Sequence, residues 1–273
     1  MTSYTYLPES DSAPTYFEWL PLYHEVAEEL GIDVARDNLA TYLVRRLLLE
    51  RKVLDTQLPR MTPTTIVFGA GPSLERVLPR LADSIPRGLG LAAANGATKA
   101  LLELGLVPTI VASDLDGGVE HLVEACRRGS TLFLHVHGDN IGLVLANIDA
   151  LLGHCRLVVT TQVPRPPHPL VNLGGFTDGD RACIASFVLG ARRLLLVGMD
   201  LCCPYVGRYS KGLEVRALRF KEVKLRIARL VLERLGRRIE LFEVGSKCLT
   251  SSRCLSVEEA RALVRNWLGQ LYA

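Results

Sequence analysis

The chain has 273 residues, of which 48% are hydrophobic and 22% charged, and its formal net charge is +3 at pH 7. These values are typical of a soluble globular protein, and so small a net charge argues against a nucleic-acid binder. No stretch approaches the roughly 18 apolar residues of a membrane span, and the first residues lack the basic and apolar regions of a signal peptide, so we expect a cytoplasmic protein.

Two helices are expected between Tyr16 and Leu54, with Asp33 as the N-cap of the second. Apolar residues recur at helical spacing in the second helix, which predicts that one face packs against the rest of the protein. They are Leu39, Leu43, Leu47 and Leu48. We expect residues 1–60 to be a helical extension with a stabilising role; a subunit contact in a homo-oligomer and a cover over a ligand remain open alternatives.

From Ile66 onward, short apolar runs alternate with helical stretches. The expected strands are 66–68, 89–93, 109–112, 131–136, 157–160, 194–197 and 238–244. The expected helices are 73–82, 97–104, 119–127, 141–152, 180–189 and 218–235. Apolar strands joined by helices predict an α/β fold, a mostly parallel sheet with helices on both faces. We expect a catalytic core over residues 61–205, completed by a basic helix, a strand and a helix in residues 206–273.

Asp114 and Asp116 follow one of these apolar runs, where a strand gives way to a loop. Two carboxylates at this spacing can converge on Mg²⁺, which prefers oxygen ligands. Further acidic residues recur at later strand ends; they are Asp139, Asp178, Asp180 and Asp200. Aspartate is also common in turns and helix caps, so the order of these loops carries more information than any one of them.

Gly69-Ala70-Gly71-Pro72-Ser73 follows the first expected strand and opens a helix. Such a turn can bring backbone N–H groups close to a phosphate, or it can be a tight turn capped by Ser73. It departs from the dinucleotide fingerprint because Leu74 takes the place of the last glycine. Asn95 ends the second strand in a similar way, where a helix cap is the simpler interpretation.

His135, His137, Asp139 and Asn140 crowd the end of another strand. A zinc site would need a further nitrogen or sulfur ligand, so contact with phosphate or with a metal-binding carboxylate fits better. One of the two histidines is expected to be structural. At the start of a later helix, Arg181 could bind a phosphate through its planar guanidinium.

The seven cysteines are scattered without a CxxC pair, which makes a zinc site a poor interpretation. Buried thiols are expected for Cys126, Cys155 and Cys183. A disulfide between Cys248 and Cys254 remains open, and is favoured if the protein comes from a thermophile.

Taken together, GAGPSL, NGAT, SDLDG, HVHGDN, GFTDGDRA and GMDL resemble the archaeal 6-hydroxymethyl-7,8-dihydropterin pyrophosphokinases, a family distantly similar to thiamin pyrophosphokinase. The match runs from about Ile66 to Leu201. The resemblance implies a fold like the thiamin pyrophosphokinase catalytic domain, with ATP, Mg²⁺ and a hydroxymethylpterin as partners, in methanopterin or folate biosynthesis. One departure is Asn95, where the family more often has aspartate.

The resemblance also implies roles for individual residues. Asp114 and Asp116 would bind Mg²⁺ with Asp139 as a third ligand, and Asp178 or Asp180 would orient or deprotonate the attacking hydroxyl. The groups expected to bind phosphate or nucleotide are Gly69, Gly71, Ser73, Asn95, His135, His137, Asn140, Arg181, Lys221 and Lys224. Three alternatives stay open: a glycosyltransferase that uses a nucleotide sugar and the DxD pair, a thiamin-type pyrophosphokinase, and a non-catalytic nucleotide-binding module.

Overall fold

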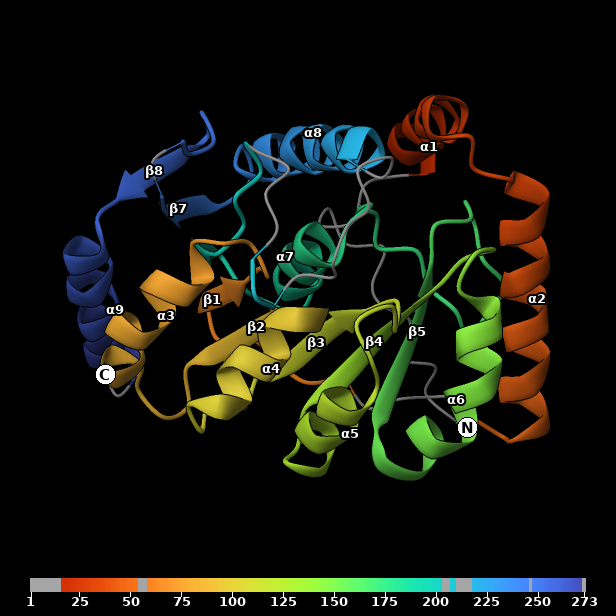
Figure 1. The fold of residues 1–273 in the computed structure, drawn as a ribbon, viewed down its shortest axis with the longest axis horizontal. Coiled ribbons are helices and arrows are strands. Elements are labelled where there is room, and N and C mark those ends of the chain that lie inside the picture. The colour runs from red at the N-terminus through yellow and green to blue at the C-terminus, as the bar shows by residue number, and fades with distance from the viewer. Residues whose placement is uncertain (1–15, 54–57, 203–206, 210–217, 246, 272–273) are drawn as a thin grey trace.

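The computed structural model describes residues 16–53, 58–202, 207–209, 218–245 and 247–271, and its centre is one sheet of eight strands (Figure 1). Every neighbouring pair of strands is parallel, in the order β5-β4-β3-β2-β1-β6-β7-β8. The strands are β1 (Thr64–Phe68), β2 (Gly90–Ala94), β3 (Ile110–Ser113), β4 (Thr131–Val136), β5 (Arg156–Thr161), β6 (Arg193–Val197), β7 (Glu240–Val244) and β8 (Ser252–Leu255).

Helices cover both faces of the sheet, because successive side chains of each strand point to opposite sides and both sets are buried. Val67 faces α7 (Asp178–Val188) and α8 (Leu218–Leu235). Ile66 faces the other side, where the covering helices are α3 (Leu74–Leu81), α4 (Asn95–Glu103) and α9 (Val257–Leu271), with α2 (Val34–Glu50), α5 (Glu120–Arg127) and α6 (Ile141–His154) further along. A 3₁₀ helix spans Ala82–Ser84. The predicted α/β class is confirmed.

The second helix packs through a different face from the predicted one. Asp33 caps α2 as expected, since its side chain accepts hydrogen bonds from the N–H groups of Ala35 and Arg36. The buried positions of α2 are Asp37, Ala40, Thr41, Val44 and Leu48. Leu39 and Leu43 are exposed, so our assignment of the buried face was wrong for both. The buried face of α2 consists largely of small and polar residues spaced four apart, which pack against β4. A prediction based on the positions of leucines therefore missed this face.

α1 (Tyr16–Leu30) lies against α8 and carries Tyr23 and Val26 into a small core with Phe176 and Ile227. The two N-terminal helices therefore pack on opposite sides of one end of the sheet, at the C-terminal ends of β4 and β5 (Figure 1). No helix among the described residues is long and apolar enough to cross a membrane.

Two local features differ from the sequence-based expectation. Cys126 and Cys155 form a disulfide between the end of α5 and the start of β5, whereas we expected two buried thiols; sequence spacing does not reveal pairs that tertiary packing brings together. Cys248 and Cys254 also form a disulfide, and the buried Cys183 is a free thiol as expected. The edge strand β8 was not predicted, because it has only four residues. Two of them are exposed, so the segment contains no run of apolar residues.

Candidate functional site

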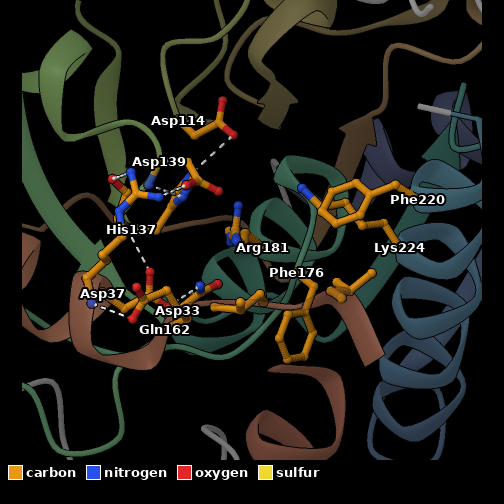
Figure 2. A pocket seen from close by; sticks show the side chains of 14 residues that line it. Asp33, Asp37, Asp114, His137, Asp139, Gln162, Phe176, Arg181, Phe220 and Lys224 are labelled. Atoms are coloured by element: carbon orange, nitrogen blue, oxygen red, sulfur yellow. Dashed lines mark hydrogen bonds and ion pairs between the residues drawn. The ribbon is translucent and has the colours of Figure 1, made fainter. Parts of the chain in front are cut away.

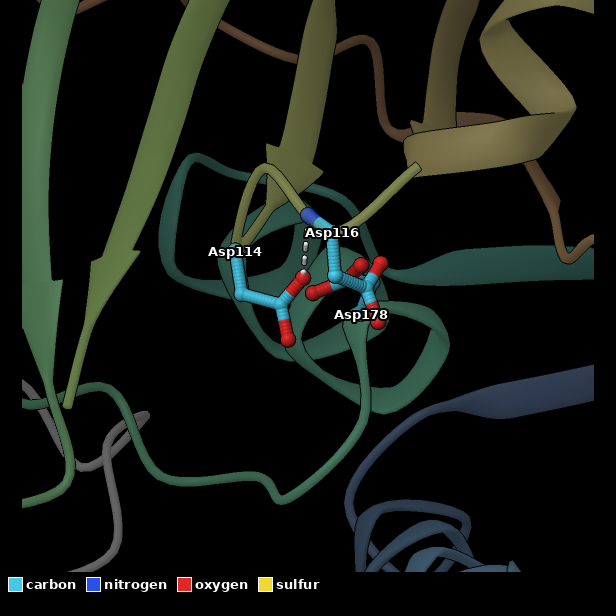
Figure 3. Close-up of side chains that lie close together, drawn as sticks. All are labelled: Asp114, Asp116 and Asp178. Carbon is cyan, nitrogen blue, oxygen red and sulfur yellow. Dashed lines mark hydrogen bonds between the residues drawn. The ribbon is translucent and has the colours of Figure 1, made fainter. Parts of the chain in front are cut away.

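Three carboxylates converge at the C-terminal edge of the sheet. Asp114 and Asp116 lie in the loop after β3, and Asp178 is the first residue of α7 (Figure 3). One oxygen of each lies within 4.8 Å of the others, close enough for all three to bind a single metal ion. A hydrogen bond of 3.2 Å from the N–H of Asp116 to Asp114 Oδ1 holds the loop in shape. Oxygen donors of this kind suit a hard cation such as Mg²⁺.

The carboxylates repel one another, and their pKa values show it. Burial first, and then the charges of Asp114 and Asp116, raise the pKa of Asp178 well above its ordinary value, although Arg181 opposes them. Burial would also raise the pKa of Asp114, but His137, Arg181 and Asp116 outweigh it, so that the pKa is lowered. The charged form of Asp178 is thus disfavoured by burial and by its neighbours, and a divalent cation bound to the three carboxylates would relieve their repulsion.

Two asparagines orient the aspartates. Asn95 donates a hydrogen bond of 3.3 Å to Asp116 Oδ1, while its own Oδ1 lies 2.9 Å from His121 Nε2. Asn140 donates to the backbone oxygens of Asp114 and His135, at 2.9 and 2.7 Å, and ties the ends of β3 and β4 together. Both were predicted to bind the nucleotide. Their amide groups are engaged within the protein and hold the loop of Asp114 and Asp116, while nucleotide binding by either asparagine stays a prediction.

Cationic groups flank the carboxylates. Arg181 is buried, its Nη1 lies 3.5 Å from Asp178 Oδ1, and its Nε has no hydrogen-bond partner among the described residues. Lys224 of α8 lies over the ring of Phe220, and its pKa is lowered by burial and then by Arg181. His137 Nε2 is 3.8 Å from Asp114 Oδ2. Lys221 lies outside the residues that line the pocket described next.

A pocket of about 500 Å³, including the part open to solvent, adjoins this cluster (Figure 2). Asp114 lies at one end with His137, Arg181 lies near the middle, and Lys224 lies at the side beside Phe220. Asp37 and Gln162 lie at the other. The remaining lining residues include the apolar side chains Leu30, Ile32, Phe176 and Phe220.

Two predicted acidic residues have other roles. Asp139 lies outside the metal cluster, because its side chain is 78% exposed and forms an ion pair of 3.1 Å with Arg36; Asp178 is the third carboxylate instead. Asp180 is fully buried and caps α7 by accepting hydrogen bonds from Phe176 N, Thr177 N and Thr177 Oγ1. With its oxygens committed to the cap, Asp180 cannot reach a substrate hydroxyl, so we correct its assignment as a catalytic residue.

His135 is the structural histidine of the pair. It is buried, and its Nδ1 lies 3.1 Å from Thr160 Oγ1. Burial, followed by Arg181 and His137, lowers its pKa well below the ordinary value. It lines a smaller cavity behind Arg181 and not the main pocket, so it has no direct access to a nucleotide there.

The glycine-rich turn lies further along the same edge, between β1 and β6, where the strand order reverses. Asp200 accepts a hydrogen bond of 2.7 Å from Ser73 N, and a side chain on Gly71 would collide with the same carboxylate. A side chain on Gly69 would meet Gly198 O at 2.6 Å. Ser73 Oγ is buried and has no hydrogen-bond partner among the described residues. The turn is therefore closely packed, and its Ser73 Oγ could still hydrogen-bond a ligand.

Several residues around the pocket carry no signal in the sequence. Asp37 and Gln162 belong to no recognisable motif. Phe176 and Phe220 lie in segments where the sequence drew attention only to the charged residues nearby. His121, which contacts Asn95, is an isolated histidine in the first turn of α5. Apart from His121, which directly follows the DxD loop in the chain, each is remote from that loop in sequence, so only the folded chain brings them together.

The comparisons with known proteins agree on one family. Residues 38–205 match the model of the family described as 6-hydroxymethylpterin diphosphokinase MptE-like, which is more than half of the chain. A 6-hydroxymethyl-7,8-dihydropterin pyrophosphokinase from Pyrococcus furiosus is 37% identical over 222 residues, covering 79% of this chain and 92% of the relative. The enzyme of the same name from Methanothermobacter thermautotrophicus is 38% identical over 197 residues, covering 71% of this chain and 81% of the relative.

Solved structures show more distant likenesses. The α-2,3-sialyltransferase Cst-I from Campylobacter jejuni has a TM-score of 0.44 at 11% identity, over 71% of this chain and 82% of that chain. Thiamine pyrophosphokinase from Bacillus subtilis has a TM-score of 0.34 at 14% identity, over 66% of this chain and 59% of that chain.

Proposed function

Because this chain belongs to the MptE-like 6-hydroxymethylpterin diphosphokinase family and is thus a diphosphotransferase, we propose that it transfers the β,γ-diphosphate of ATP to the hydroxymethyl oxygen of 6-hydroxymethyl-7,8-dihydropterin and releases AMP. The observation that carries the proposal is the cluster of Asp114, Asp116 and Asp178 beside Arg181, next to a pocket that has apolar walls and polar groups at its ends. The product would serve folate or methanopterin biosynthesis.

The order of groups along the edge of the sheet supports a place for each substrate. The pocket adjoins the ends of β4 and β5, the carboxylates follow β3, and the glycine-rich turn follows β1. We propose the pocket for the pterin and the turn for ATP, where the unpartnered Ser73 Oγ is available to a phosphate or ribose oxygen. The diphosphate would then lie between them, beside the carboxylates.

Asp114, Asp116 and Asp178 would hold Mg²⁺, which supplies charge neutralisation for the phosphate oxygens. The hydroxymethyl oxygen forms a bond to the β-phosphorus of ATP, and the bond from that phosphorus to the oxygen of AMP breaks. Arg181 and Lys224 neutralise the developing charge. The proton of the hydroxyl passes to the carboxylate oxygen of Asp178 that does not bind the metal. Since phosphoryl transfer needs little covalent help, positioning by Asn95 and Asn140 matters as much.

The test is an assay of AMP release from ATP with a panel of acceptors. We expect AMP and the pterin diphosphate in equal amounts when 6-hydroxymethyl-7,8-dihydropterin and Mg²⁺ are both present, and neither product after chelation of the metal. Thiamin and simple sugars should support no release above the background of ATP hydrolysis.

Other outcomes would identify the alternatives. Faster AMP release with thiamin than with the pterin would make the protein a thiamin-type pyrophosphokinase. Turnover of a nucleotide sugar in place of ATP would support the glycosyltransferase alternative. The non-catalytic alternative is set aside because the family consists of diphosphokinases.

A further inference from the structure

Asp37 is a buried carboxylate at the end of the pocket away from the metal cluster (Figure 2). It belongs to α2, one residue before the segment that matches the family model, and only 2% of its surface is exposed. It accepts hydrogen bonds from Tyr23 Oη at 3.0 Å, Gln162 Nε2 at 2.6 Å and Gly138 N at 2.7 Å. These contacts hold the carboxylate in one orientation at the pocket wall.

All three donors to Asp37 are neutral. The ion pairs among the described residues do not include it, and the neighbouring Arg36 pairs with Asp139 instead. A buried carboxylate is costly unless its charge is compensated. A carboxylate also has about four acceptor positions, so one remains for a ligand. Asp37 is therefore suited to a neutral ligand edge rich in N–H donors.

The walls between the two ends are apolar. Phe176 and Phe220 lie on one side of the pocket, and Leu30 and Ile32, from the end of α1 and the turn that follows it, line it as well. Such a surface favours a flat heterocycle whose polar groups lie on its edges. A pteridine that carries a hydroxymethyl group has two such edges. Its aminopyrimidinone edge presents adjacent N–H donors, and its hydroxymethyl group projects from the opposite ring.

We propose that Asp37, oriented by Gln162 and Tyr23, is the specificity-determining residue that accepts a hydrogen bond from the 2-amino group of the pterin ring. This inference rests on the proposed function, since it names the recognition element of the same substrate site. With the aminopyrimidinone edge at Asp37, the hydroxymethyl group points past Arg181 toward Asp114 at the other end of the pocket. The N-terminal helices thus contribute a substrate contact in addition to packing.

The test compares two ligands that differ at one position. Oxidised 6-hydroxymethylpterin carries a 2-amino group, and 6-hydroxymethyllumazine carries a 2-oxo group in its place. Both are fluorescent, so dissociation constants can be measured by titration without turnover. The proteins are the full-length wild type, Asp37→Asn and a matched control, Asp33→Asn. Asp33 lines the same pocket and caps the same helix, a role that asparagine fills equally well.

We expect the wild type to bind the pterin about 10- to 100-fold more tightly than the lumazine, the range for a charge-assisted hydrogen bond. Asp37→Asn should weaken pterin binding by a similar factor while strengthening lumazine binding, because its amide can donate to the 2-oxo group. Asp33→Asn should leave both constants within about threefold of the wild type, which separates recognition from the loss of one charge.

Equal binding of the two ligands by the wild type would overturn the inference without any variant. So would an Asp37→Asn protein that loses both ligands equally and unfolds at a lower temperature, since Asp37 would then be a structural anchor. Failure of the proposed function has a different signature: wild type that binds neither pteridine, or that releases no AMP with the dihydropterin.

Discussion

At the scale of single residues, the site brings three carboxylates close enough to repel one another. The pKa of Asp114 is lowered and that of Asp178 is raised, because Asp178 is buried beside the charges of Asp114 and Asp116. Asn95 and Asn140 hold the loop through hydrogen bonds and add no charge of their own. Replacing a carboxylate should therefore change chemistry far more than stability.

Asp116→Asn should reduce turnover by about 10³-fold, equivalent to about 4 kcal/mol of transition-state stabilisation. The variant loses a metal-binding charge, yet its side-chain oxygen can still accept the hydrogen bond from Asn95. Initial rates and the thermal midpoint should be measured together, and the midpoint should stay level or rise as repulsion is relieved. Asp139→Asn is the matched control and should stay within a few-fold of the parent, because Asp139 lies outside the cluster. The reverse ranking would restore Asp139 as the ligand.

Arg181→Lys should lower kcat by about 10- to 100-fold, or about 1.4–2.7 kcal/mol. Lysine keeps the charge but loses the planar set of donors, one of which, Nε, is free of partners among the described residues. Steady-state kinetics with varied ATP provide the measurement. Arg193→Lys is the control and should behave as the parent, because Arg193 begins β6 and so lies at the edge of the sheet opposite the site. Equal kinetics for the two variants would leave Arg181 a structural role alone.

At the scale of elements, one carboxylate of α8 makes several hydrogen bonds to the turn between β7 and β8, at the far end of the sheet. Glu233 accepts hydrogen bonds from Thr250 N at 2.7 Å, Thr250 Oγ1 at 2.7 Å and Ser251 N at 2.8 Å, in the turn between β7 and β8. Burial raises the pKa of Glu233, but these donors outweigh it and lower the pKa from 4.5 to about 2. The helix that carries Lys224 to the site is thereby tied to the edge strands.

Glu233→Gln should lower the stability of the fold at neutral pH by about 1–2 kcal/mol, a value already reduced for solvent screening. Because the pKa is about 2 in the folded protein and 4.5 ordinarily, the carboxylate contributes fully above pH 4.5. Its contribution is lost as the pH falls toward 2, so the difference between variant and parent should shrink in that range. Thermal midpoints at pH 7 and pH 3 test this, with the exposed Glu222→Gln as control. A difference that does not depend on pH would contradict the ion-based account.

At the scale of the whole molecule, the N-terminal helices close one end of the α/β core and line its pocket at the same time. Ala40, Val44 and Leu48 of α2 pack with residues of β3, β4 and β5, and α1 packs on Phe176 and α8. Leu30 and Asp37 reach the pocket from the same two helices, and Ile32 reaches it from the turn between them. Packing and ligand contact are therefore not separate roles for this segment.

Leu48→Ala should cost about 2–5 kcal/mol of stability, because Leu48 is 1% exposed and its removal leaves a cavity. Leu43→Ala, on the same helix, should change stability by less than about 0.5 kcal/mol, because Leu43 is 40% exposed. Denaturant unfolding of both variants measures the difference. Similar losses in the two would mean that the exposed face of α2 is also covered in solution, as in the homo-oligomer that the sequence left open.

The sequence by itself determined the class of the fold, the DxD loop and the family. Apolar runs such as residues 66–68 and 131–136 are local signals, and a parallel sheet follows from their alternation with helices. Asp114 and Asp116 stand out because both lie in one short motif after such a run. The Asp33 cap and the Cys248–Cys254 pair also involve residues close in sequence, and the structure has both.

Tertiary structure alone decided which acidic residue joins Asp114 and Asp116, and which residues line the other end of the pocket. Asp139 and Asp178 look alike in sequence, but only Asp178 is carried to Asp114 by the packing of α7 against β2 and β3. Asp37 and Gln162 are 125 positions apart, and Cys126 and Cys155 are 29 apart. Contacts of this kind depend on how whole elements stack, a balance of burial and close packing that no local pattern of residues records.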